Sequence, residues 1–470
     1  MRIYLRSLSL GVLLALASLA VAAEEGTIRL VLWQGFKYSE VGELTANVEE
    51  FTKSWNASHT PRIEIAVQQV SFDDMVKRMK TAALAHITPD MAFVDANSMV
   101  SLVYGQVARP LDTLKNFPPN GIEELRKEYV PGAFDTNVVE FGGKKHLYGL
   151  PAQTTTLALF WNKKMFRDRA TELKAAGLDP ERPPRDWDEF IRYGKILTQP
   201  EKGLFAYGLT NSLWFSMPIM NQYGVSLVRR DENGVLVPNL SNPRTEAAVN
   251  RNVNFFLKDK VEAGAWREGQ LDPGQGFLNQ KYAMILIGPW MIENFRASKL
   301  DFGVALVPRV PLEEAKRLGL VPPDADDNST AAQHLSSGNI GGQNLMVVSA
   351  SKHPEVCFEF ARFFSSEKVQ RGWAEKLGQI PICVAAQKNL DLSKFPEVPT
   401  FIEQVNLARP LPPLPFGGTL EVDIVNPEIN LVLQGNRSTK DALASIEKKM
   451  AARILAPVNE AEAAARDSAK

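Results

Sequence analysis

The stretch TIRLVLW, Thr27–Trp33, decides the fold, because its apolar side chains first alternate with polar ones and then continue without a break. This pattern is typical of a buried β-strand. Helical periodicity follows from Val41 to Trp55, a second strand-like stretch covers Ile63–Val67, and a second helical pattern covers Asp73–Ala85. Strands that alternate with helices predict βαβ units around a mostly parallel sheet, which is an α/β fold.

A third strand-like stretch, Met91–Asp95, ends in a carboxylate, and the first stretch ends in Trp33. In α/β sheets, ligands bind beyond the carboxyl ends of the strands. Trp33 and Asp95 are therefore predicted to border one crevice.

The pattern starts again near residue 155, which predicts a second α/β unit joined to the first. The predicted elements are the strand Thr156–Trp161, the helix Trp187–Leu197, the strand Tyr282–Ile287, and a strand–helix pair at Asn344–Val348 and Pro354–Phe364. A helical pattern also runs from Lys440 to Ala456. Residues 459–470 lack an apolar stripe, so we expect them to form a flexible tail.

Composition sets the size and class of the protein. The 470 residues fit two to three domains, or two large lobes, at about 150 residues per domain. Apolar residues make up 45% and charged residues 23%, as in ordinary globular proteins. With 53 basic against 54 acidic residues and no dense basic block, the chain lacks the positive surface that nucleic acids require.

The N-terminus has the pattern of a secretion signal. Arg2 and Arg6 precede the apolar run Leu8–Ala23, and Ala20-Val21-Ala22 has the small residues that signal peptidase accepts. The alternative is a membrane anchor, but the run is shorter than the about 20 residues that span a bilayer. We therefore expect residues 1–22 to be removed, which predicts a periplasmic protein. Because no cysteine follows the run, we expect no lipid anchor.

The two cysteines leave two readings open. In an exported chain, Cys357 and Cys383 can form a disulfide. Cys357 lies in an apolar stretch, where a free thiol packs equally well in a core.

Sequence patterns for catalysis and metal binding are absent. The chain has no G-x-S-x-G, and its five histidines include no H-E-x-x-H pair. The acidic loop at residues 324–328 lacks the glycine and the bidentate glutamate of a calcium loop. We therefore predict no metal, no cofactor and no catalytic residues, although carboxylate pairs that form only in the fold stay open.

Tryptophans stand at the ends of predicted elements and in loops, among them Trp33, Trp214 and Trp290. A loop tryptophan often only covers the core. Sugars, however, expose C–H groups on their ring faces, which an indole covers, and hydroxyls at their edges, which polar side chains bind. The tryptophans therefore favour a carbohydrate ligand.

Short motifs occur in order along most of the chain. They are Thr88-Pro89-Asp90, Gly105 with Pro110-Leu111, Leu147–Pro151, Trp161–Phe166, Trp187–Phe190, Gly288-Pro289-Trp290, Gly341-Gly342, Ser351–Glu355 and Gln379-Ile380-Pro381. Together they resemble the extracellular solute-binding proteins of bacterial ABC importers, of the type 1 class that includes maltose-binding protein. Each motif is weak alone, but their order and spacing are specific.

This resemblance implies two lobes, each with a central, mostly parallel sheet flanked by helices, and a ligand cleft between them. Lobe 1 would comprise residues 23–154 and 345–397, and lobe 2 residues 155–344 and 398–458. The chain would cross between them after Leu150-Pro151, near Gly341-Gly342, and near Glu397–Phe401.

The resemblance also implies a set of solute contacts. They are Trp33, Gln34, Asp95 and Asn97 in lobe 1, Thr154 and Thr155 on the hinge strand, Trp214 and Trp290 in lobe 2, and Gln343 after the second crossing. Thr155 stands where maltose-binding protein has an acidic contact, so the same ligand is not implied.

By this resemblance, the protein is a monomer that captures a sugar or related polyol by lobe closure and delivers it to the permease of an ABC importer. A chemoreceptor is a compatible second partner. The alternative is a secreted carbohydrate-active enzyme, either a glycosidase or a lyase, and a glycosidase would need two carboxyl groups that flank the substrate.

Overall fold

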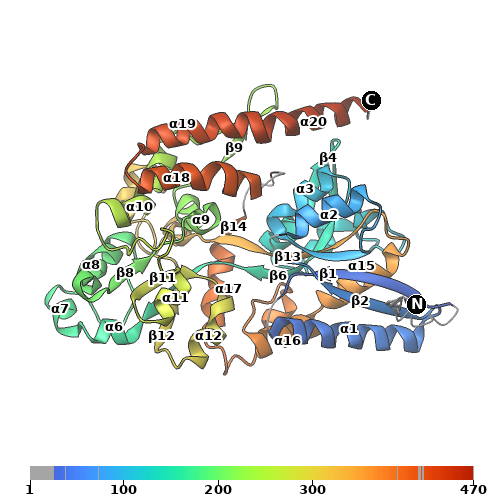
Figure 1. Cartoon of the computed structure of the whole chain (residues 1–470), viewed down its shortest axis with the longest axis horizontal. Helices are drawn as coiled ribbons and strands as arrows, with labels where there is room; N and C mark the ends of the chain where they lie inside the picture. The colour runs from blue at the N-terminus through green and yellow to red at the C-terminus, as the bar shows by residue number, and fades with distance from the viewer. Residues whose placement is uncertain are drawn as a thin grey trace, which may run out of the picture.

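The computed structural model describes residues 26–36, 39–71, 74–388, 390–410, 414 and 418–468, so the predicted signal, residues 1–22, lies outside the described residues. Two α/β lobes lie side by side and are joined by the strands β6 (Gly149–Thr155) and β13 (Asn339–Val347) (Figure 1). We call the part built around β1 the first lobe and the part built around β7 the second lobe. The predicted α/β fold with two lobes is confirmed.

The sheet of the first lobe has the strand order β14-β13-β3-β1-β2, and β6 also pairs with β13. Its other strands are β1 (Ile28–Gln34), β2 (Ile63–Gln69), β3 (Met91–Asp95) and β14 (Arg409–Pro410). One face is covered by α1 (Ser39–Ser58), α15 (Pro354–Phe364) and α16 (Glu367–Leu377), and the other by α2 (Met75–Leu84) and α3 (Met99–Tyr104) (Figure 1). Smaller elements are α4 (Gly121–Arg126), α5 (Pro131–Asp135) and the hairpin β4 (Val138–Phe141) and β5 (Lys144–Leu147).

The sheet of the second lobe has the order β12-β7-β11-β8. Its strands are β7 (Ala158–Asn162), β8 (Phe205–Gly208), β11 (Tyr282–Ile287) and β12 (Phe302–Ala305). The helices are α6 (Lys163–Arg167), α7 (Ala170–Ala175), α8 (Trp187–Leu197), α9 (Leu213–Gln222), α10 (Pro243–Leu257), α11 (Pro273–Leu278), α12 (Ile292–Ala297), α13 (Leu312–Arg317), α14 (Thr330–Gln333) and α18 (Asn426–Leu433). A hairpin of β9 (Val228–Arg230) and β10 (Leu236–Pro238) lies outside the sheet.

Both sheets are mixed rather than mostly parallel. β1 is parallel to β2 and β3, as predicted, but β13 is antiparallel to β3 and β6. In the second lobe β7 is antiparallel to β11 and β12, and β11 is parallel to β8. The cause lies in the connections, because the chain enters the second lobe along β6 and β7 and returns along β13. A crossing strand takes its direction from the crossing and not from a βαβ unit.

The apolar core continues from one lobe to the other beneath the crossing strands. One cluster of buried side chains holds Leu32 and Phe93 of the first sheet together with Phe160 and Ile285 of the second. Phe401 on α17 (Val398–Leu407) connects the lobes, and its ring centroid lies 5.9 Å from that of Phe160. The shared cluster therefore forms the base from which the two lobes extend.

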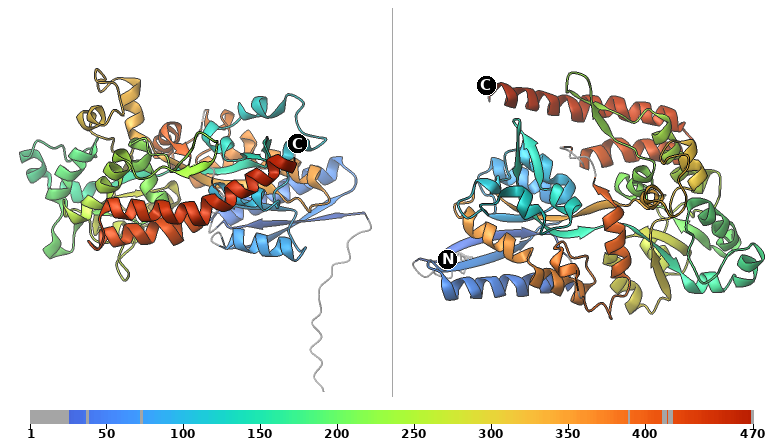
Figure 2. Two further views of the ribbon diagram at one scale, coloured as in Figure 1. Left: turned by 90° about the horizontal axis from the view of Figure 1, so that it is seen from above. Right: turned by 180° about the vertical axis from the view of Figure 1, so that it is seen from behind.

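The C-terminal segment continues as a helix where the sequence predicted a flexible tail. Helix α19 (Thr439–Met450) passes through a π-helical turn, η8 (Ala451–Leu455), into α20 (Ala456–Ser468). The Asn459 side chain exchanges two hydrogen bonds of 3.0 Å with the Leu236 backbone. Glu462 accepts hydrogen bonds from Tyr104 of the first lobe and Arg230 of the second, each at 3.1 Å. These polar contacts, rather than an apolar stripe, hold α20 across both lobes (Figures 1 and 2).

The two cysteines are free. Cys357 packs on α15 and Cys383 follows α16, and both thiols are buried. Of the two readings that the sequence left open, the structure therefore has the core thiols and not the disulfide. Over the residues that the structure describes, every helix is too short or too polar to cross a membrane.

Candidate functional site

Several of the predicted site residues meet where β6, β13 and the end of β3 run side by side. Gln343 on β13 pairs directly opposite Asp95 on one side and Gln153 on the other. Gly341, two residues earlier, pairs with Thr155. Because directly opposed residues leave an antiparallel pair on the same face, the side chains of Asp95 and Gln343 point the same way. The crossing strands thus bring residues from both halves of the sequence within contact distance.

Trp214 covers the β13 crossing strand at Gly341. A Cβ atom on Gly341 would lie 3.0 Å from the indole Nε1, so the indole comes this close because residue 341 is glycine. The Asn339 amide nitrogen donates a 2.9 Å hydrogen bond to the Trp214 carbonyl oxygen. The indole stands in the first turn of α9, whose N-terminus is capped by the Ser212 hydroxyl. A short helix end thereby presents the ring to the strand.

Trp290 lies next to Trp214. It stands in the 3₁₀ turn η4 (Pro289–Met291), just after β11, and 41% of its surface is exposed. The two ring centroids are 6.0 Å apart and the planes are inclined by 43°. A Cβ atom on Gly288 would lie 1.8 Å from the Trp290 ring, so the ring lies directly against the Gly288 backbone. The second lobe thus presents two adjoining indoles, one of them open to solvent.

Three oxygen atoms beside these indoles are buried without a hydrogen-bond partner among the described residues. They are Thr155 Oγ1, Asn339 Oδ1 and Gln343 Oε1. Buried polar atoms in folded proteins are nearly always paired, so these three oxygens have unused hydrogen-bonding capacity. A polar ligand with hydroxyl groups offers the missing donors.

Asp95 lies in an environment that disfavours its charge. Burial raises the pKa of this carboxyl to about 6, hydrogen bonds from Ser98 and from the Asn97 backbone oppose the rise, and the negative charge of Glu421 adds to it. Glu421 stands in the π-helical turn η7 (Thr419–Val425) of the second lobe, and the Ser212 hydroxyl donates a hydrogen bond to it. Glu421 was not predicted from the sequence, since no motif marks it and its closeness to Asp95 exists only in the fold.

The structure does not bring all the predicted site residues together. Trp33 pairs in register with Ala92, three residues before Asp95, so the two side chains leave the sheet on opposite faces. Trp33 packs beside α2 and α3, and its indole nitrogen donates to Gln68 at 2.9 Å.

Of three further predicted contacts, two are hydrogen-bonded within the protein and one lies beside Asp95. Gln34 is 2% exposed, and its amide bonds to Gln69 and to the Phe36 backbone, which braces the loop after β1. Thr154 is fully buried, with its hydroxyl 3.5 Å from the Gly341 carbonyl oxygen. Asn97 is half-buried in the 3₁₀ turn after β3, beside Asp95.

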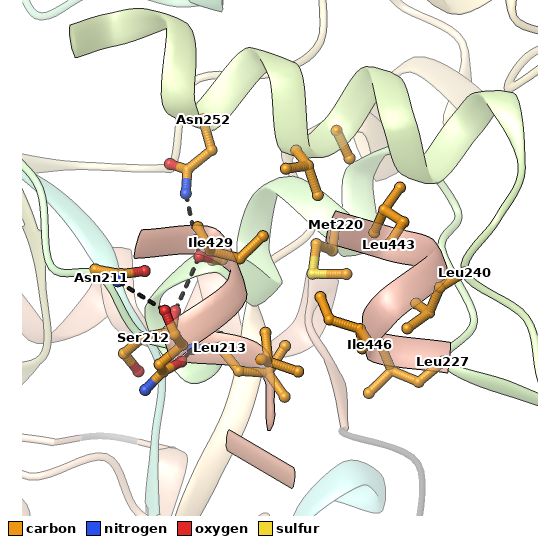
Figure 3. Close-up of a pocket in the computed structure, with 15 residues that line it drawn as sticks. Asn211, Ser212, Leu213, Met220, Leu227, Leu240, Asn252, Ile429, Leu443 and Ile446 are labelled. Carbon is orange, nitrogen blue, oxygen red and sulfur yellow. Dashed lines mark hydrogen bonds between the residues drawn. The ribbon is translucent and has the colours of Figure 1, made fainter. Parts of the chain in front are cut away.

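A small apolar cavity lies behind α9 (Figure 3). Its volume is about 30 Å³, room for only about two water molecules, so it is too small for a solute. Leu213 and Met220 of α9 face Ile429 of α18 and Leu443 of α19 across it. At its rim, the Leu213 backbone nitrogen donates to the Asn426 side chain at 2.9 Å. This packing fixes the start of α9 and with it the Trp214 indole.

The site offers surfaces and atoms suited to binding. Two indoles offer flat apolar faces, and the neighbouring oxygens accept hydrogen bonds. Within the described ranges, no group of three histidine, cysteine, aspartate or glutamate side chains could hold a metal ion.

Comparisons with known proteins agree with this description. The family model described as "Bacterial extracellular solute-binding protein" matches residues 39–371. The galactooligosaccharide-binding protein of Bacillus subtilis is 21% identical over 85% of this chain and 83% of its own length. The sn-glycerol-3-phosphate-binding periplasmic protein UgpB of Pectobacterium atrosepticum is 24% identical over 87% of this chain and 88% of its own length.

Solved structures share the fold. The GacH receptor of Streptomyces glaucescens, solved without ligand and with acarbose, superimposes with a TM-score of 0.71, covering 90% of this chain and 97% of that one at 21% identity. The sugar-binding protein MalE of Xanthomonas citri gives a TM-score of 0.69, over 93% and 98% at 19% identity. Since the family model covers most of the chain, this protein belongs to the bacterial extracellular solute-binding protein family.

Proposed function

We propose that this solute-binding protein is exported to the periplasm, captures a small carbohydrate or related polyol, and delivers it to the permease of an ABC importer. The observation that carries the proposal is the pair of adjoining indoles, Trp214 and Trp290, beside the unpaired oxygens of Thr155 and Gln343. Indole faces suit the C–H faces of a sugar ring, and oxygen acceptors suit its hydroxyls. Asp95 adds a charged acceptor at the end of β3.

Capture would work by closure of the two lobes. The crossing strands give the lobes a common base, and solute contacts come from both sides of it. A ligand that touches both lobes only in the closed state shifts an open–closed equilibrium toward closure. The closed form, and not the solute itself, is then what a permease or a chemoreceptor recognises.

The relatives support a carbohydrate more than an enzyme activity. The names of the curated relatives include galactooligosaccharide and maltotriose binding, and solved neighbours hold maltotetraose or tagatose. The relatives are binding proteins, so the comparisons lend no support to a secreted glycosidase or lyase.

A sugar panel tests the proposal directly. Thermal unfolding of the mature protein should shift upward with its ligand, because a ligand at 100 times its Kd adds about 2.7 kcal/mol of stability. Trp214→Ala and Trp290→Ala should each weaken binding by about 1–3 kcal/mol, as stacking on aromatic side chains does elsewhere. Trp266→Ala, in the second lobe but outside the site, is the matched control and should keep the affinity. A panel in which no sugar or polyol stabilises the protein, or in which a glycan is cleaved, would contradict the proposal.

A further inference from the structure

Two carboxylates from opposite lobes, Asp95 and Glu421, lie at the same site. Asp95 ends β3 in the first lobe. Glu421 stands in the second lobe in η7, a turn that packs against α18 and α19. Glu421 is the charged group that perturbs the Asp95 carboxyl most strongly. The two negative charges are therefore close enough to interact across the junction of the lobes.

Hydrogen bonds and packing connect both carboxylates to the same indole. The Ser212 hydroxyl donates to Glu421 and caps α9, and Trp214 follows two residues later. Trp214 lies against Gly341, and two residues further along β13 Gln343 pairs directly with Asp95. Starting from either carboxylate, the contacts thus lead to the Trp214 ring.

Neither carboxylate is neutralised within the described residues. Asp95 accepts hydrogen bonds from the Ser98 hydroxyl, at 3.0 Å, and from the backbone of Asn97 and Ser98. Glu421 accepts from the Ser212 hydroxyl. All of these donors are uncharged, and Asp95 and Glu421 are both half-buried residues rather than fully enclosed ones.

A second, independent observation points to a ligand with donor groups. Gln343 is 6% exposed, leaves the sheet on the same face as Asp95, and has an unpaired Oε1 atom. Thr155 Oγ1 and Asn339 Oδ1 are buried and unpaired in the same way. Acceptor oxygens and negative charge therefore lie beside the pair of indoles.

We propose that Asp95 and Glu421 form an acidic pair that admits neutral and amine-bearing polyols and rejects phosphorylated ones, which makes Glu421 a residue that determines specificity. This inference rests on the proposed function and narrows its ligand class. A hydroxyl or a protonated amine donates to the carboxylates, whereas a phosphate is repelled by both. In this respect the chain would differ from its relatives that bind sn-glycerol 3-phosphate.

The test is a charge series at constant ring size. The mature protein is titrated by calorimetry, at pH 7.5 and low salt, with glucosamine, glucose and glucose 6-phosphate, then with the three galactose counterparts, and finally with sn-glycerol 3-phosphate. We expect the amine to bind at least as tightly as the neutral sugar and the phosphate at least tenfold more weakly. Salt at 0.5 M should reduce the discrimination, because it screens charge.

Variants assign the discrimination to residues. Glu421→Gln keeps an acceptor for Ser212 and removes one charge, and should reduce the ratio of neutral to phosphate affinity at least threefold. Asp95→Asn, in the first lobe, should also reduce this ratio of affinities at least threefold. Asp423→Asn is the matched control, since Asp423 lies on the same turn but pairs with Arg453, 3.6 Å away, and it should leave the ratio unchanged.

The outcomes separate two failures. If sugars bind through Trp214 and Trp290 but the phosphates bind equally well, or if Glu421→Gln and Asp95→Asn leave the ratio unchanged, the acidic pair is overturned and the proposed function stands. Tight phosphate binding would instead point to Arg409, an exposed cation on β14 that pairs with Asn339. If no member of the series and no sugar of the panel binds, the proposed function falls and this inference with it.

Discussion

Alanine substitutions at the adjacent glycines Gly341 and Gly342 should have different effects. Gly342→Ala should lower the stability of the fold, whereas Gly341→Ala should weaken solute binding. Gly342 has a φ of +130°, a backbone conformation open almost only to glycine. A Cβ atom there would lie 2.0 Å from the Gln153 carbonyl oxygen, which is backbone and cannot swing away. Gly341 has no such φ, and a Cβ there would lie 3.0 Å from the Trp214 Nε1, at the edge of a ring that can tilt.

The magnitudes follow from these contacts. For Gly342→Ala, backbone strain adds about 1–3 kcal/mol and the clash with β6 a further 1–3, so about 2–6 kcal/mol of stability should be lost. That is a large share of the roughly 5–15 kcal/mol that stabilises most proteins. For Gly341→Ala, the lower entropy of the unfolded chain offsets a small overlap, so stability should change by less than about 1 kcal/mol. The displaced indole should weaken solute binding about fivefold, or about 1 kcal/mol.

Urea unfolding followed by circular dichroism measures the first effect, and calorimetric titration with the sugar found in the panel measures the second. Wild-type protein and Trp266→Ala serve as references for both. If Gly342→Ala unfolds within about 1 kcal/mol of wild type, the strained crossing of β6 and β13 is wrong. If Gly341→Ala binds as tightly as wild type, Trp214 does not belong to the solute site.

Further predictions concern charge, the C-terminal helix and the thiols. The pKa of Asp95 is raised to about 6, so the folded state binds a proton more tightly than the unfolded state, and stability should fall as pH rises from about 4 to about 6. Asp95→Asn should therefore raise the free energy of unfolding by about 1–2 kcal/mol more at pH 7.5 than at pH 4.5, allowing for solvent screening. A stability difference between variant and wild type that does not change with pH would contradict this. Tyr104→Phe removes the hydrogen bond from the first lobe to Glu462. It should lower stability by about 1 kcal/mol and speed amide hydrogen exchange in α20. Unchanged exchange in α20 would mean that the contact does not restrain the helix. Burial raises the pKa of Cys357 to about 12, and Cys383 is also buried, so a thiol reagent should label the two side chains only after unfolding. Rapid labelling of the native protein would contradict the buried positions.

Local patterns in the sequence were enough to predict several elements of the fold. The strands Met91–Asp95 and Tyr282–Ile287 and the helices Trp187–Leu197 and Pro354–Phe364 have the predicted bounds, because apolar periodicity and flanking turns are local signals. The C-terminal helix was predicted only as far as Ala456, since the residues that its last part contacts, Leu236, Tyr104 and Arg230, are far away in sequence.

The candidate site was predicted less well, for a geometric reason. The rule that ligands bind at strand ends places Trp33 and Asp95 together, but it ignores register. Trp33 pairs with Ala92, and side chains alternate along a strand, so a separation of three residues puts Asp95 on the other face. Register between strands is a tertiary property, and a single sequence does not contain it in readable form.

Glu421, which no sequence pattern marks, also bears on how the two lobes close. If each lobe contributes one carboxylate, closing the empty protein brings two like charges together without a donor between them, which opposes closure. A solute with hydroxyl or amine groups supplies those donors, so the closed state becomes favourable only when the site is filled. On this mechanism Glu421→Gln should weaken the coupling between binding and closure as well as the choice of ligand. An increase in the closed population of ligand-free Glu421→Gln, measured by the distance between spin labels on the two lobes, is the expected result, and an unchanged distance distribution would limit Glu421 to ligand selection.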